Sequence, residues 1–413
     1  MPAHPPTRRI NGAPIRRIGM LSTYPPKLCG LATFAAALTH ALRDAGHRVD
    51  VIRINDGHEP TAIGQTVAGE LVNGSAASMR NAAATLSRCD AVIVQHEYGI
   101  FGGDDGDEVL QLLDALDSPA IVVLHTVPLV PTEHQKSVLE DMCARAARVV
   151  VMTESANTRL LSSYAVVAER VDIVPHGATL AETSGTALNS ATLANTDRPQ
   201  LLTWGLLGPG KGIEHVIDAV ALLSDVRPRL RYTVAGVTHP KVFARSGDAY
   251  RHSLMRRTWF SGVAGAVTFD DTYRNVTQLT RFVASSSVVV LPYDSRDQVT
   301  SGVLVDALAA GRPVIATAFP HAVEALASGA GVVVPHADPV AMADAIRSVV
   351  CDAELLATMT AEARRIAPSL GWSACGPIRG HRQGCSGLRR WGRAIASHWA
   401  SSNRRGRRSA KGR

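Results

Sequence analysis

Short apolar runs rich in β-branched residues alternate with longer amphipathic stretches through the first half of the chain. Residues 31–46, "LATFAAALTHALRDAG", have the period of an amphipathic helix that ends at Gly46. The apolar runs lie at 16–21, 48–54, 91–96, 120–125, 148–153 and 171–175. Strands of this kind that alternate with helices form right-handed βαβ units, so the pattern predicts a parallel sheet.

The pattern breaks at residues 178–200, which are rich in Thr, Ala, Ser and Asn and have no strong period. A second series of apolar runs follows at 201–204, 230–236, 266–269, 287–292, 313–317 and 331–335, with helices near 213–224, 338–350 and 352–366. The two series predict an α/β protein of two doubly wound, Rossmann-like domains, each with one parallel sheet. Ligands of such sheets bind outside the carboxyl ends of the strands, so a cleft between two facing sheets is the expected site.

The length of 413 residues agrees with two domains, because it is too great for one ordinary core. The predicted parts are a flexible N-terminus, a first domain, a linker, a second domain, a terminal helix with a partial crossover, and a basic tail. They occupy residues 1–15, 16–180, 181–198, 199–350, 351–372 and 373–413.

Composition narrows the class of protein. Hydrophobic residues make up 46% and charged residues 19% of the chain, which is typical of globular α/β proteins. No apolar run approaches the roughly 18 to 20 residues that span a bilayer, and no apolar segment follows the basic residues near the N-terminus, so no secretory signal is expected. The six cysteines show no CxxC spacing, which indicates reduced thiols in a cytoplasmic protein.

The positive net charge belongs to the tail. The chain carries +7 in total; residues 371–413 contribute +11, from ten Arg and one Lys, which leaves −4 for the first 370 residues. The tail is interpreted as a solvated, disordered end. A basic arm and a weak terminal helix at 387–400 remain alternatives. A further alternative is that the tail binds nucleic acid. In that case the affinity for nucleic acid should vanish when residues 373–413 are deleted. No specific nucleic-acid partner is expected.

One stretch with candidate chemistry is "LPYDSRDQVTSGVLVDALAAGRPVIAT" at 291–317, a polar loop between a buried strand and a helix of small residues. Thr300, Ser301 and Gly302 fall where the helix begins, so their N–H groups are expected to be free and to favour an anion. Asp306 follows Gln298 by eight residues and lies inside the helix. The plainer interpretation is that Ser301 caps the helix and Asp306 is a solvated acid.

A second stretch, "WGLLGPGKGIEHVIDAV" at 204–220, joins a strand to a helix through a glycine-rich turn. Backbone amides, room from Gly205, Gly208 and Gly212, and the cation of Lys211 make the layout of a phosphate site. The stretch is neither a GxxxxGK[ST] P-loop nor a GxGxxG dinucleotide fingerprint.

Taken together, six stretches in order resemble glycosyltransferase family 4, the retaining glycosyltransferases of the two-domain GT-B fold, over about residues 16–372. They are "TYPPKLCGLATF" (23–34), "VLHTVP" (123–128), "VPHGA" (174–178), "GLLGPGKG" (205–212), "TVAG" (233–236) and "QVTSGVLVDALAAGRPVIAT" (298–317). The resemblance implies a first domain that binds the acceptor and a second that binds a nucleotide-diphosphate sugar.

The resemblance also implies roles for single residues. Gly30 would lie in the first-domain loop beside the donor, His125 by the donor sugar, and Lys211 at the diphosphate with the amides of Ser301, Gly302 and Val303. His96 and Glu97, at another strand end, would lie on the acceptor side.

The chain departs from the family pattern mildly at Cys29, which replaces one of two paired glycines, and at His176, which replaces an asparagine. Three further departures concern the donor site. The first glutamate of the family's E-x7-E segment is Gln298, and the second is Asp306. Asp306 would accept hydrogen bonds from the ribose hydroxyls, and Gln298 would contact the sugar hydroxyls. The arginine of the phosphate motif is Leu206, for which Arg296 or Lys27 could compensate.

The implied reaction moves a hexose, with retention, from the nucleotide sugar to a hydroxyl of a glycan, glycoside or lipid. The leaving diphosphate takes the acceptor's proton, and the protein positions the reactants and stabilises charge. No metal ion is expected, because the acid pairs at 104–105 and 270–271 are typical of surface turns. No cofactor is expected besides the nucleotide sugar, which is a co-substrate. The alternative is a sugar-nucleotide-binding or scaffolding protein without turnover. Peripheral contact with the inner membrane surface and the oligomeric state stay open.

Overall fold

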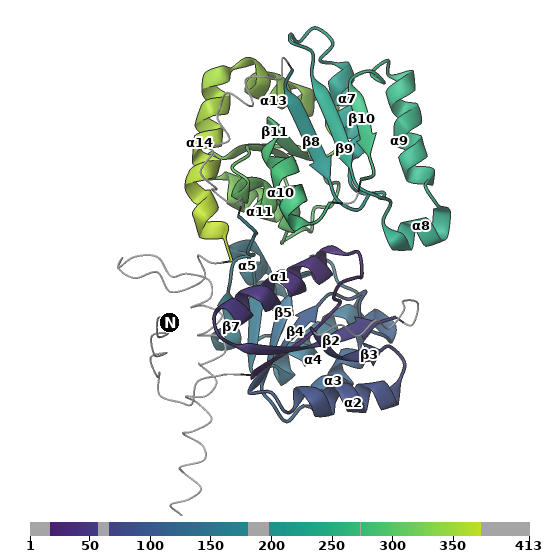
Figure 1. The fold of residues 1–413 in the computed structure, drawn as a ribbon, viewed down its shortest axis with the longest axis vertical. Helices are drawn as coiled ribbons and strands as arrows, with labels where there is room; N and C mark the ends of the chain where they lie inside the picture. Colours follow the sequence, from purple (N-terminus) through teal and green to yellow (C-terminus); the bar gives the residue numbers. More distant parts are fainter. Residues whose placement is uncertain (1–16, 57–65, 181–197, 273, 373–413) are drawn as a thin grey trace, which may run out of the picture. The chain divides into compact units, whose positions relative to one another are not determined.

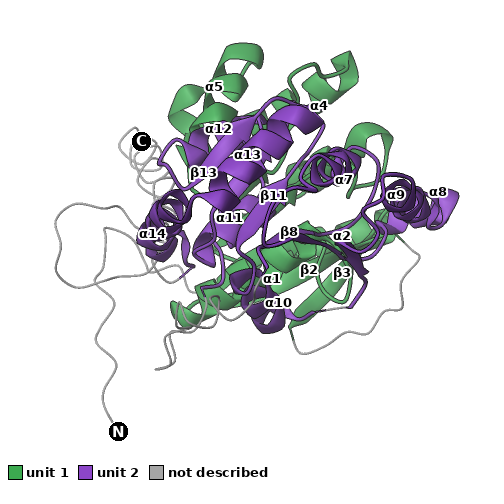
Figure 2. Cartoon of the chain, turned by 90° about the horizontal axis from the view of Figure 1, so that it is seen from above, with its two compact units in different colours: residues 1–175, 375–413 green, residues 176–374 purple. Residues whose placement is uncertain are grey.

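The computed structural model describes residues 17–56, 66–180, 198–272 and 274–372. Two compact units divide this part of the chain between Pro175 and His176, as the two colours of Figure 2 show. Three of the predicted segments lie outside the described residues: the flexible N-terminus, most of the linker, and the basic tail. Residues 176–180, expected at the end of the first domain, are grouped with the second unit.

Unit 1 contains one sheet of seven strands, all parallel, in the order β3-β2-β1-β4-β5-β6-β7. The strands are β1 (Arg17–Ser22), β2 (Arg48–Asn55), β3 (Val67–Val72), β4 (Ala91–His96), β5 (Ala120–Leu124), β6 (Arg148–Val151) and β7 (Val171–Ile173). The helices are α1 (Gly30–Asp44), α2 (Ala76–Leu86), α3 (Glu108–Asp114), α4 (Glu133–Arg145) and α5 (Glu154–Ser163), with short 3₁₀ turns at Asp104–Gly106 and Ala168–Arg170.

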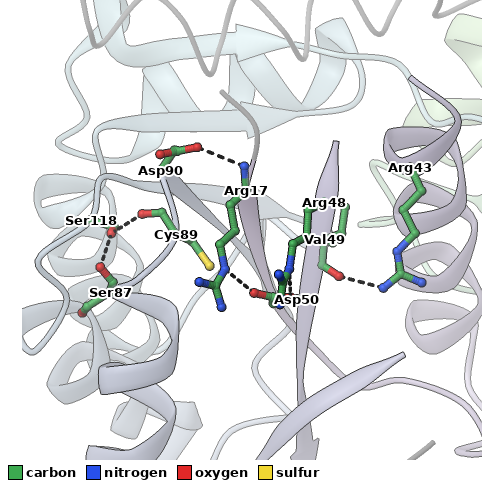
Figure 3. Close-up of polar contacts among 9 residues, drawn as sticks. All are labelled: Arg17, Arg43, Arg48, Val49, Asp50, Ser87, Cys89, Asp90 and Ser118. Atoms are coloured by element: carbon green, nitrogen blue, oxygen red, sulfur yellow. Dashed lines mark hydrogen bonds and ion pairs between the residues drawn. The ribbon is translucent and has the colours of Figure 1, made fainter. Parts of the chain in front are cut away.

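Charged residues fix the amino ends of the central strands of unit 1 (Figure 3). The Arg17 guanidinium on β1 and the Arg48 guanidinium on β2 both donate to the carboxylate of Asp50. Burial opposes the charge on Asp50, but these two donors outweigh it and hold its pKa below the ordinary value. The Arg17 N–H donates to Asp90, just before β4, at 3.0 Å. Three neighbouring strands are thereby tied together at the edge opposite their carboxyl ends.

Unit 2 contains one sheet of six parallel strands in the order β10-β9-β8-β11-β12-β13 (Figure 1). The strands are β8 (Gln200–Trp204), β9 (Arg231–Ala235), β10 (Val267–Asp270), β11 (Val288–Leu291), β12 (Val314–Thr317) and β13 (Gly331–Val334). The helices are α7 (Ile213–Ala221), α8 (Pro240–Ser246), α9 (Ala249–Phe260), α10 (Val276–Ala284), α11 (Gly302–Ala309), α12 (Pro320–Leu326), α13 (Pro339–Cys351) and α14 (Ala353–Leu370).

Helices cover both faces of the unit 2 sheet, which explains why its strands are apolar on both sides. Leu201 and Leu202 are consecutive in β8, so they face opposite sides of the sheet. Leu201 packs in the core with residues of α7, α9 and α13, whereas Leu202 packs in the core with residues of α10, α11 and α12. This is the doubly wound arrangement that the sequence predicts.

In each unit two central strands lead to connections that diverge. The β8 connection runs to β9 on one side, and the β11 connection runs to β12 on the other. The β1 and β4 connections of unit 1 diverge in the same way. Such switch points open a crevice at the carboxyl ends of the strands. In unit 2 the segments that follow β8 and β11 are 205–212 and 292–301, which are the two stretches with candidate chemistry.

The first residues of unit 2 pair with its last described residues. The Ala178 N–H donates to the Leu370 carbonyl at 2.7 Å, and the Trp372 N–H donates to the Ala178 carbonyl at 3.2 Å. A side chain at Gly177 would overlap the Trp372 ring. Backbone hydrogen bonds therefore join the first residues of unit 2 to its last described residues. Within the described residues, no helix combines the length and apolar character that a membrane span requires.

Candidate functional site

The glycine-rich turn after β8 lies against the segment after β11. Gly210 and Gly212 have positive φ of 86° and 65°, which is the left-handed region that favours glycine. A Cβ at Gly212 would overlap the Pro292 carbonyl oxygen. The Asp294 N–H donates to the Gly210 carbonyl at 3.1 Å. The structure thus brings together the two segments that the sequence treats as parts of one phosphate site.

Lys211 is the cation of this corner. Its ammonium nitrogen lies 4.6 Å from the centroid of the Tyr293 ring, an arrangement that stabilises a cation through the ring quadrupole. Burial lowers the pKa of Lys211. Among the residues that the structure describes, no carboxylate forms an ion pair with it, and no other charged group shifts its pKa. A half-buried ammonium without a counter-ion is suited to an anionic ligand.

Tyr293 connects the two segments. Its side chain is 2% exposed, and burial raises its pKa, while the nearby Ser301 side chain opposes that rise. Thr317 at the end of β12 donates to the Tyr293 carbonyl at 2.6 Å, and His336 Nδ1 lies 2.9 Å from the same oxygen. The ring is therefore held between Lys211 on one side and the beginning of α11 on the other.

Helix α11 begins where the sequence predicts, but one of its expected free donors is used. Ser301 is the N-cap, and its hydroxyl accepts from the Leu304 N–H at 3.3 Å. The Ser301 N–H, which was expected to be free, donates to His321 Nδ1 at 2.8 Å. That expectation is wrong for Ser301, because a side chain 20 residues later occupies its N–H. Gly302 and Val303 hold the first two helical positions, whose N–H groups have no acceptor within a helix.

Two histidines, His321 buried and His176 half-buried, flank the beginning of α11. His321 is 7% exposed, and burial lowers its pKa to about 4, so it is neutral near pH 7 and its Nδ1 can accept a hydrogen bond. Burial, with a smaller effect of His321, lowers the pKa of His176 to about 4. His176 Nε2 would lie 3.0 Å from a Cβ at Gly302, so a larger residue at Gly302 would have to displace the ring.

The two residues that stand for the family's acidic pair lie on either side of this helix start. Gln298 is half-buried, and its amide donates to the Thr300 carbonyl at 3.2 Å. Asp306 is one turn into α11, and burial raises its pKa to about 7. Within the described chain no hydrogen bond or ion pair involves its carboxyl group, and the residue is half-buried rather than fully exposed.

A cluster of Glu214, His215 and Asp294 lies beside Lys211, and sequence reasoning missed it. Their ligand atoms lie within 4.8 Å of one another, close enough to hold a metal ion. However, His215 Nε2 is 3.2 Å from Asp294 Oδ1, and Tyr250 donates to Glu214 at 2.8 Å. Asp294 Oδ1 is buried and makes no hydrogen bond with the described residues. The His215 contact joins the start of α7 to the segment after β11.

The remaining glycines of the turn let backbones approach closely. Gly205 and Gly236 follow β8 and β9, and a Cβ at Gly236 would overlap the Gly205 carbonyl. At Gly208 a Cβ would lie 3.2 Å from the Val242 side chain of α8. Gly205 and Gly208 therefore allow neighbouring segments to pack closely at the carboxyl end of β8.

In unit 1, His125 follows β5. Its Nε2 lies 2.7 Å from Gln95 Oε1, and its ring packs edge-on against Phe34 at 4.8 Å between centroids. Gln95 is fully buried and holds the ring from the neighbouring strand. His125 is half-buried at the carboxyl edge of the sheet, where the sequence places it. Sequence reasoning did not find Gln95.

The other unit 1 predictions differ in burial. His96 is fully buried at the end of β4, and burial lowers its pKa to about 4. Within the described residues neither of its ring nitrogens has a hydrogen-bond partner. Glu97 accepts from the Thr126 hydroxyl and is partly exposed. Gly30 is the exposed first residue of α1, with open space where a Cβ would lie, and Cys29 caps that helix.

The two cations suggested as replacements for the missing arginine are placed differently. Lys27 donates to Asp56 at 2.7 Å, so it already has a counter-ion. Arg296 is exposed in the segment after β11, and no ion pair involves it in the part of the chain that the structure describes.

Comparison with known proteins finds similar families for both units. The family model for glycosyl transferases group 1 matches residues 186–366, and the model for Glycosyltransferase Family 4 matches residues 29–182. D-inositol 3-phosphate glycosyltransferases of Frankia alni and Streptomyces scabiei are each 28% identical, over 60% and 62% of this chain. The matched part spans about three fifths of the length of these relatives, at 61% and 60%.

Solved structures share the fold. Anabaena HepE in complex with UDP and glucose superposes with a TM-score of 0.68 at 19% identity, covering 86% of this chain and 96% of that one. Sucrose-phosphate synthase from Thermosynechococcus elongatus gives a TM-score of 0.70 at 18% identity, covering 94% and 100%. The two family models together match most of both units. The chain therefore belongs to the group 1 glycosyltransferases of family 4 and has the two parallel-sheet domains of the GT-B fold.

Proposed function

We propose that this protein transfers a hexose from a nucleotide-diphosphate sugar to an acceptor hydroxyl, with retention and without a metal ion. Unit 2 binds the donor and unit 1 supplies the acceptor side. The observation that carries the proposal is the Lys211 ammonium, held over Tyr293 beside the amino end of α11 and without a counter-ion among the described residues. A diphosphate supplies the missing negative charge.

The diphosphate site combines one cation with backbone donors. Lys211 meets one phosphate, and the N–H groups of Gly302 and Val303 meet the other at the positive end of the helix dipole. As the glycosidic bond breaks, charge grows on the leaving phosphate oxygen. Fixed donors of this kind stabilise that charge without reorganising, and the oxygen can then take the acceptor's proton.

The rest of the donor follows from the neighbouring groups. Asp306, whose carboxyl has no protein partner in the described chain, accepts from the ribose hydroxyls, and Gln298 contacts the transferred sugar. The close backbones at Gly205 and Gly236 accommodate the base. HepE was solved with UDP and glucose, which supports UDP-glucose as the first donor to test and UDP as the first ligand for binding measurements.

Unit 1 provides the acceptor side in this proposal. His125, fixed by Gln95, faces the transferred sugar, and His96 and Glu97 bind the acceptor. The relatives named for D-inositol 3-phosphate support a small polyol or sugar acceptor. The cysteines that the structure describes, Cys29, Cys89, Cys143 and Cys351, are all free thiols, which supports a reducing compartment such as the cytoplasm.

Replacement of Lys211 tests the proposal. In Lys211→Ala the affinity for UDP should fall at least about tenfold, and release of UDP from UDP-glucose by about 10²-fold or more, because a charge-stabilising group is lost. Affinity for uridine should not change, because uridine has no phosphate. Calorimetric titration and a coupled UDP-release assay measure these quantities. Lys136→Ala, which removes an exposed lysine of α4, is the matched control.

Equal UDP affinity in Lys211→Ala and the wild type would contradict the proposed site. Gln298 and Leu206 favour a second candidate, a sugar-nucleotide-binding protein without turnover. That candidate predicts UDP binding that depends on Lys211 but no release of UDP from any sugar nucleotide, with or without acceptors.

A further inference from the structure

A cavity of about 520 Å³ lies at the amino edge of the unit 1 sheet. Three elements supply its lining: Arg43 near the end of α1, residues 47–50 at the start of β2, and Thr66 and Ala68 at the start of β3. Its volume is in the range of sites that bind a small molecule. The strands are parallel, so this edge is opposite to the carboxyl ends, where the acceptor side is proposed. We call it the amino-edge cavity.

The one acid that lines the amino-edge cavity is already neutralised. Asp50 Oδ2 accepts from Arg17 Nε at 2.5 Å, and Asp50 Oδ1 accepts from Arg48 Nε at 3.2 Å (Figure 3). Arg17 does not belong to the lining, but its guanidinium balances the charge of Asp50. The arginines that line the cavity, Arg43 and Arg48, therefore leave an excess of positive charge there.

Arg43 and Arg48 retain donors that no described residue uses. The Arg43 guanidinium donates to the Val49 carbonyl at 2.7 Å, and Figure 3 shows it reaching from α1 to β2. It forms no ion pair with a described residue, since the adjacent Asp44 places Oδ2 3.3 Å from His40 Nε2 instead. The Arg48 side chain is 70% exposed and uses only its Nε, so within the described chain both terminal nitrogens are open to a ligand. Two guanidiniums with such donors at one cavity suit a phosphate group.

A second cavity continues from the first, because Ala68 lines both. It has a volume of about 390 Å³ and lies between β2, β3 and α2. Its one charged lining residue, Glu70, is paired with the buried Arg53. Asn81 is exposed there, and its side-chain amide makes no hydrogen bond with a described residue. The Thr85 hydroxyl donates to the backbone carbonyl of Asn81 at 2.9 Å and can still accept. The second cavity is therefore polar without excess charge.

We propose that the two cavities together bind a sugar phosphate. The phosphate lies against Arg43 and Arg48, whose planar guanidiniums can each donate two hydrogen bonds. The uncharged sugar extends past Ala68 and exchanges hydrogen bonds with Asn81 and Thr85. Inorganic phosphate would fill only the cationic end. A nucleic acid fits less well, because no Phe, Tyr or Trp lines either cavity to stack on a base. The site is separate from the proposed transfer reaction, so neither proposal depends on the other.

Calorimetric titration of the full chain with glucose 1-phosphate, glucose 6-phosphate and inositol 1-phosphate tests the site. At least one should bind the wild type saturably. Arg43→Gln/Arg48→Gln should weaken that binding at least about tenfold, because charge-assisted hydrogen bonds to the phosphate are lost. Asn81→Ala should weaken it by about threefold and leave the weaker binding of inorganic phosphate unchanged. Both replaced arginines are exposed, so the double variant should keep the wild-type melting temperature.

Other cations of the chain can attract the same anions, so two controls are needed. Arg229→Gln/Arg231→Gln removes two exposed arginines of unit 2 that form no ion pair within the described residues. It should bind the sugar phosphates as the wild type does. Lys211→Ala should also leave binding at the amino-edge cavity unchanged, which separates this site from the proposed donor site.

Absence of saturable binding of all three sugar phosphates would overturn the proposal, as would equal affinities of the wild type and Arg43→Gln/Arg48→Gln. Loss of binding in Lys211→Ala alone would assign the sugar phosphates to the donor site and also overturn it. Inorganic phosphate that binds as tightly as the sugar phosphates would show that the second cavity holds no sugar, and would overturn the choice of ligand.

Discussion

Asp306 illustrates how one residue depends on its surroundings in the fold. It is a half-buried carboxyl group in α11, and burial raises its pKa to about 7 without a compensating cation among the described residues. Such a group destabilises the free protein when it is ionised. In the proposed function, hydrogen bonds from the ribose hydroxyls to the carboxylate offset the unfavourable free energy of the partly buried charge.

Replacement of Asp306 should change stability in a pH-dependent way. Below about pH 4 the carboxyl is neutral in both folded and unfolded chains. From there to about pH 7 the folded protein retains a proton that the unfolded chain releases, and above pH 7 the folded protein holds a buried charge. The destabilising effect therefore grows up to about pH 7 and is then constant. The gain in melting temperature of Asp306→Asn over the wild type should be largest at pH 8 and smallest near pH 4.

Asp344→Asn is the control for that measurement, since Asp344 is exposed on α13. A gain for Asp306→Asn that is the same at pH 4 and pH 8 would mean that the carboxyl is well solvated in the folded protein.

Sequence reasoning reaches a single residue where the residue belongs to a local pattern. The glycine turn of Lys211 and the helix start at Ser301 are visible in consecutive residues, whereas the roles proposed for these residues stay predictions. Tyr293 and His321 were missed as site residues, because their importance comes from contacts with Lys211 and the Ser301 N–H, 82 and 20 residues away along the chain. No spacing rule connects such positions.

At the scale of elements, α11 depends on its attachment as well as on its cap. The Ser301 hydroxyl caps the helix, and His321 at the start of α12 holds the Ser301 backbone. This second contact links α12 to α11 and fixes the direction in which the Gly302 and Val303 N–H groups point. His321 is thus a positioning residue in the proposed donor site.

Loss of the His321 acceptor should destabilise the protein. His321→Ala leaves the buried Ser301 N–H without a partner, which costs about 1–3 kcal/mol in free energy of unfolding. His321→Asn can place its side-chain oxygen near the position of Nδ1 and should recover part of both stability and UDP affinity. Urea unfolding and UDP titration measure the two effects. Equal losses in the Ala and Asn variants would show that ring packing, rather than the hydrogen bond, is what matters.

The strands of unit 2 were predicted from their apolar runs, whereas helix α10 was not predicted although it is strongly amphipathic. The apolar runs from β8 to β13 match the observed strands closely. Strand β3, "VAGELV", was missed because Gly69 and Glu70 interrupt its apolar pattern. Helix α9 was not predicted either, because apolar residues lie on both its buried and its exposed sides and so produce no amphipathic period.

At the scale of the whole molecule, the predicted class of fold is confirmed: two doubly wound parallel sheets and the GT-B family. The order of strands explains why two distant glycine-bearing segments meet, since both follow strands at the switch point of unit 2. Sequence can indicate alternation of strands and helices, but the order of strands in the sheet comes from packing. The alternation of strands and helices predicted a site at the carboxyl ends of the strands, and the resemblance to a known family assigned roles to single residues there.

The pairing of Ala178 with Leu370 and Trp372 has a consequence for protein engineering. Because these two backbone segments are hydrogen-bonded neighbours, a short peptide could join them and close unit 2 into a ring. New termini could then be opened at the exposed turn of Gly262 and Gly265 between α9 and β10. Circular permutants are tolerated where the old ends are adjacent and the new ones are exposed. This permuted unit should unfold cooperatively and bind UDP; a chain that fails to fold would show that unit 2 needs unit 1 for its stability.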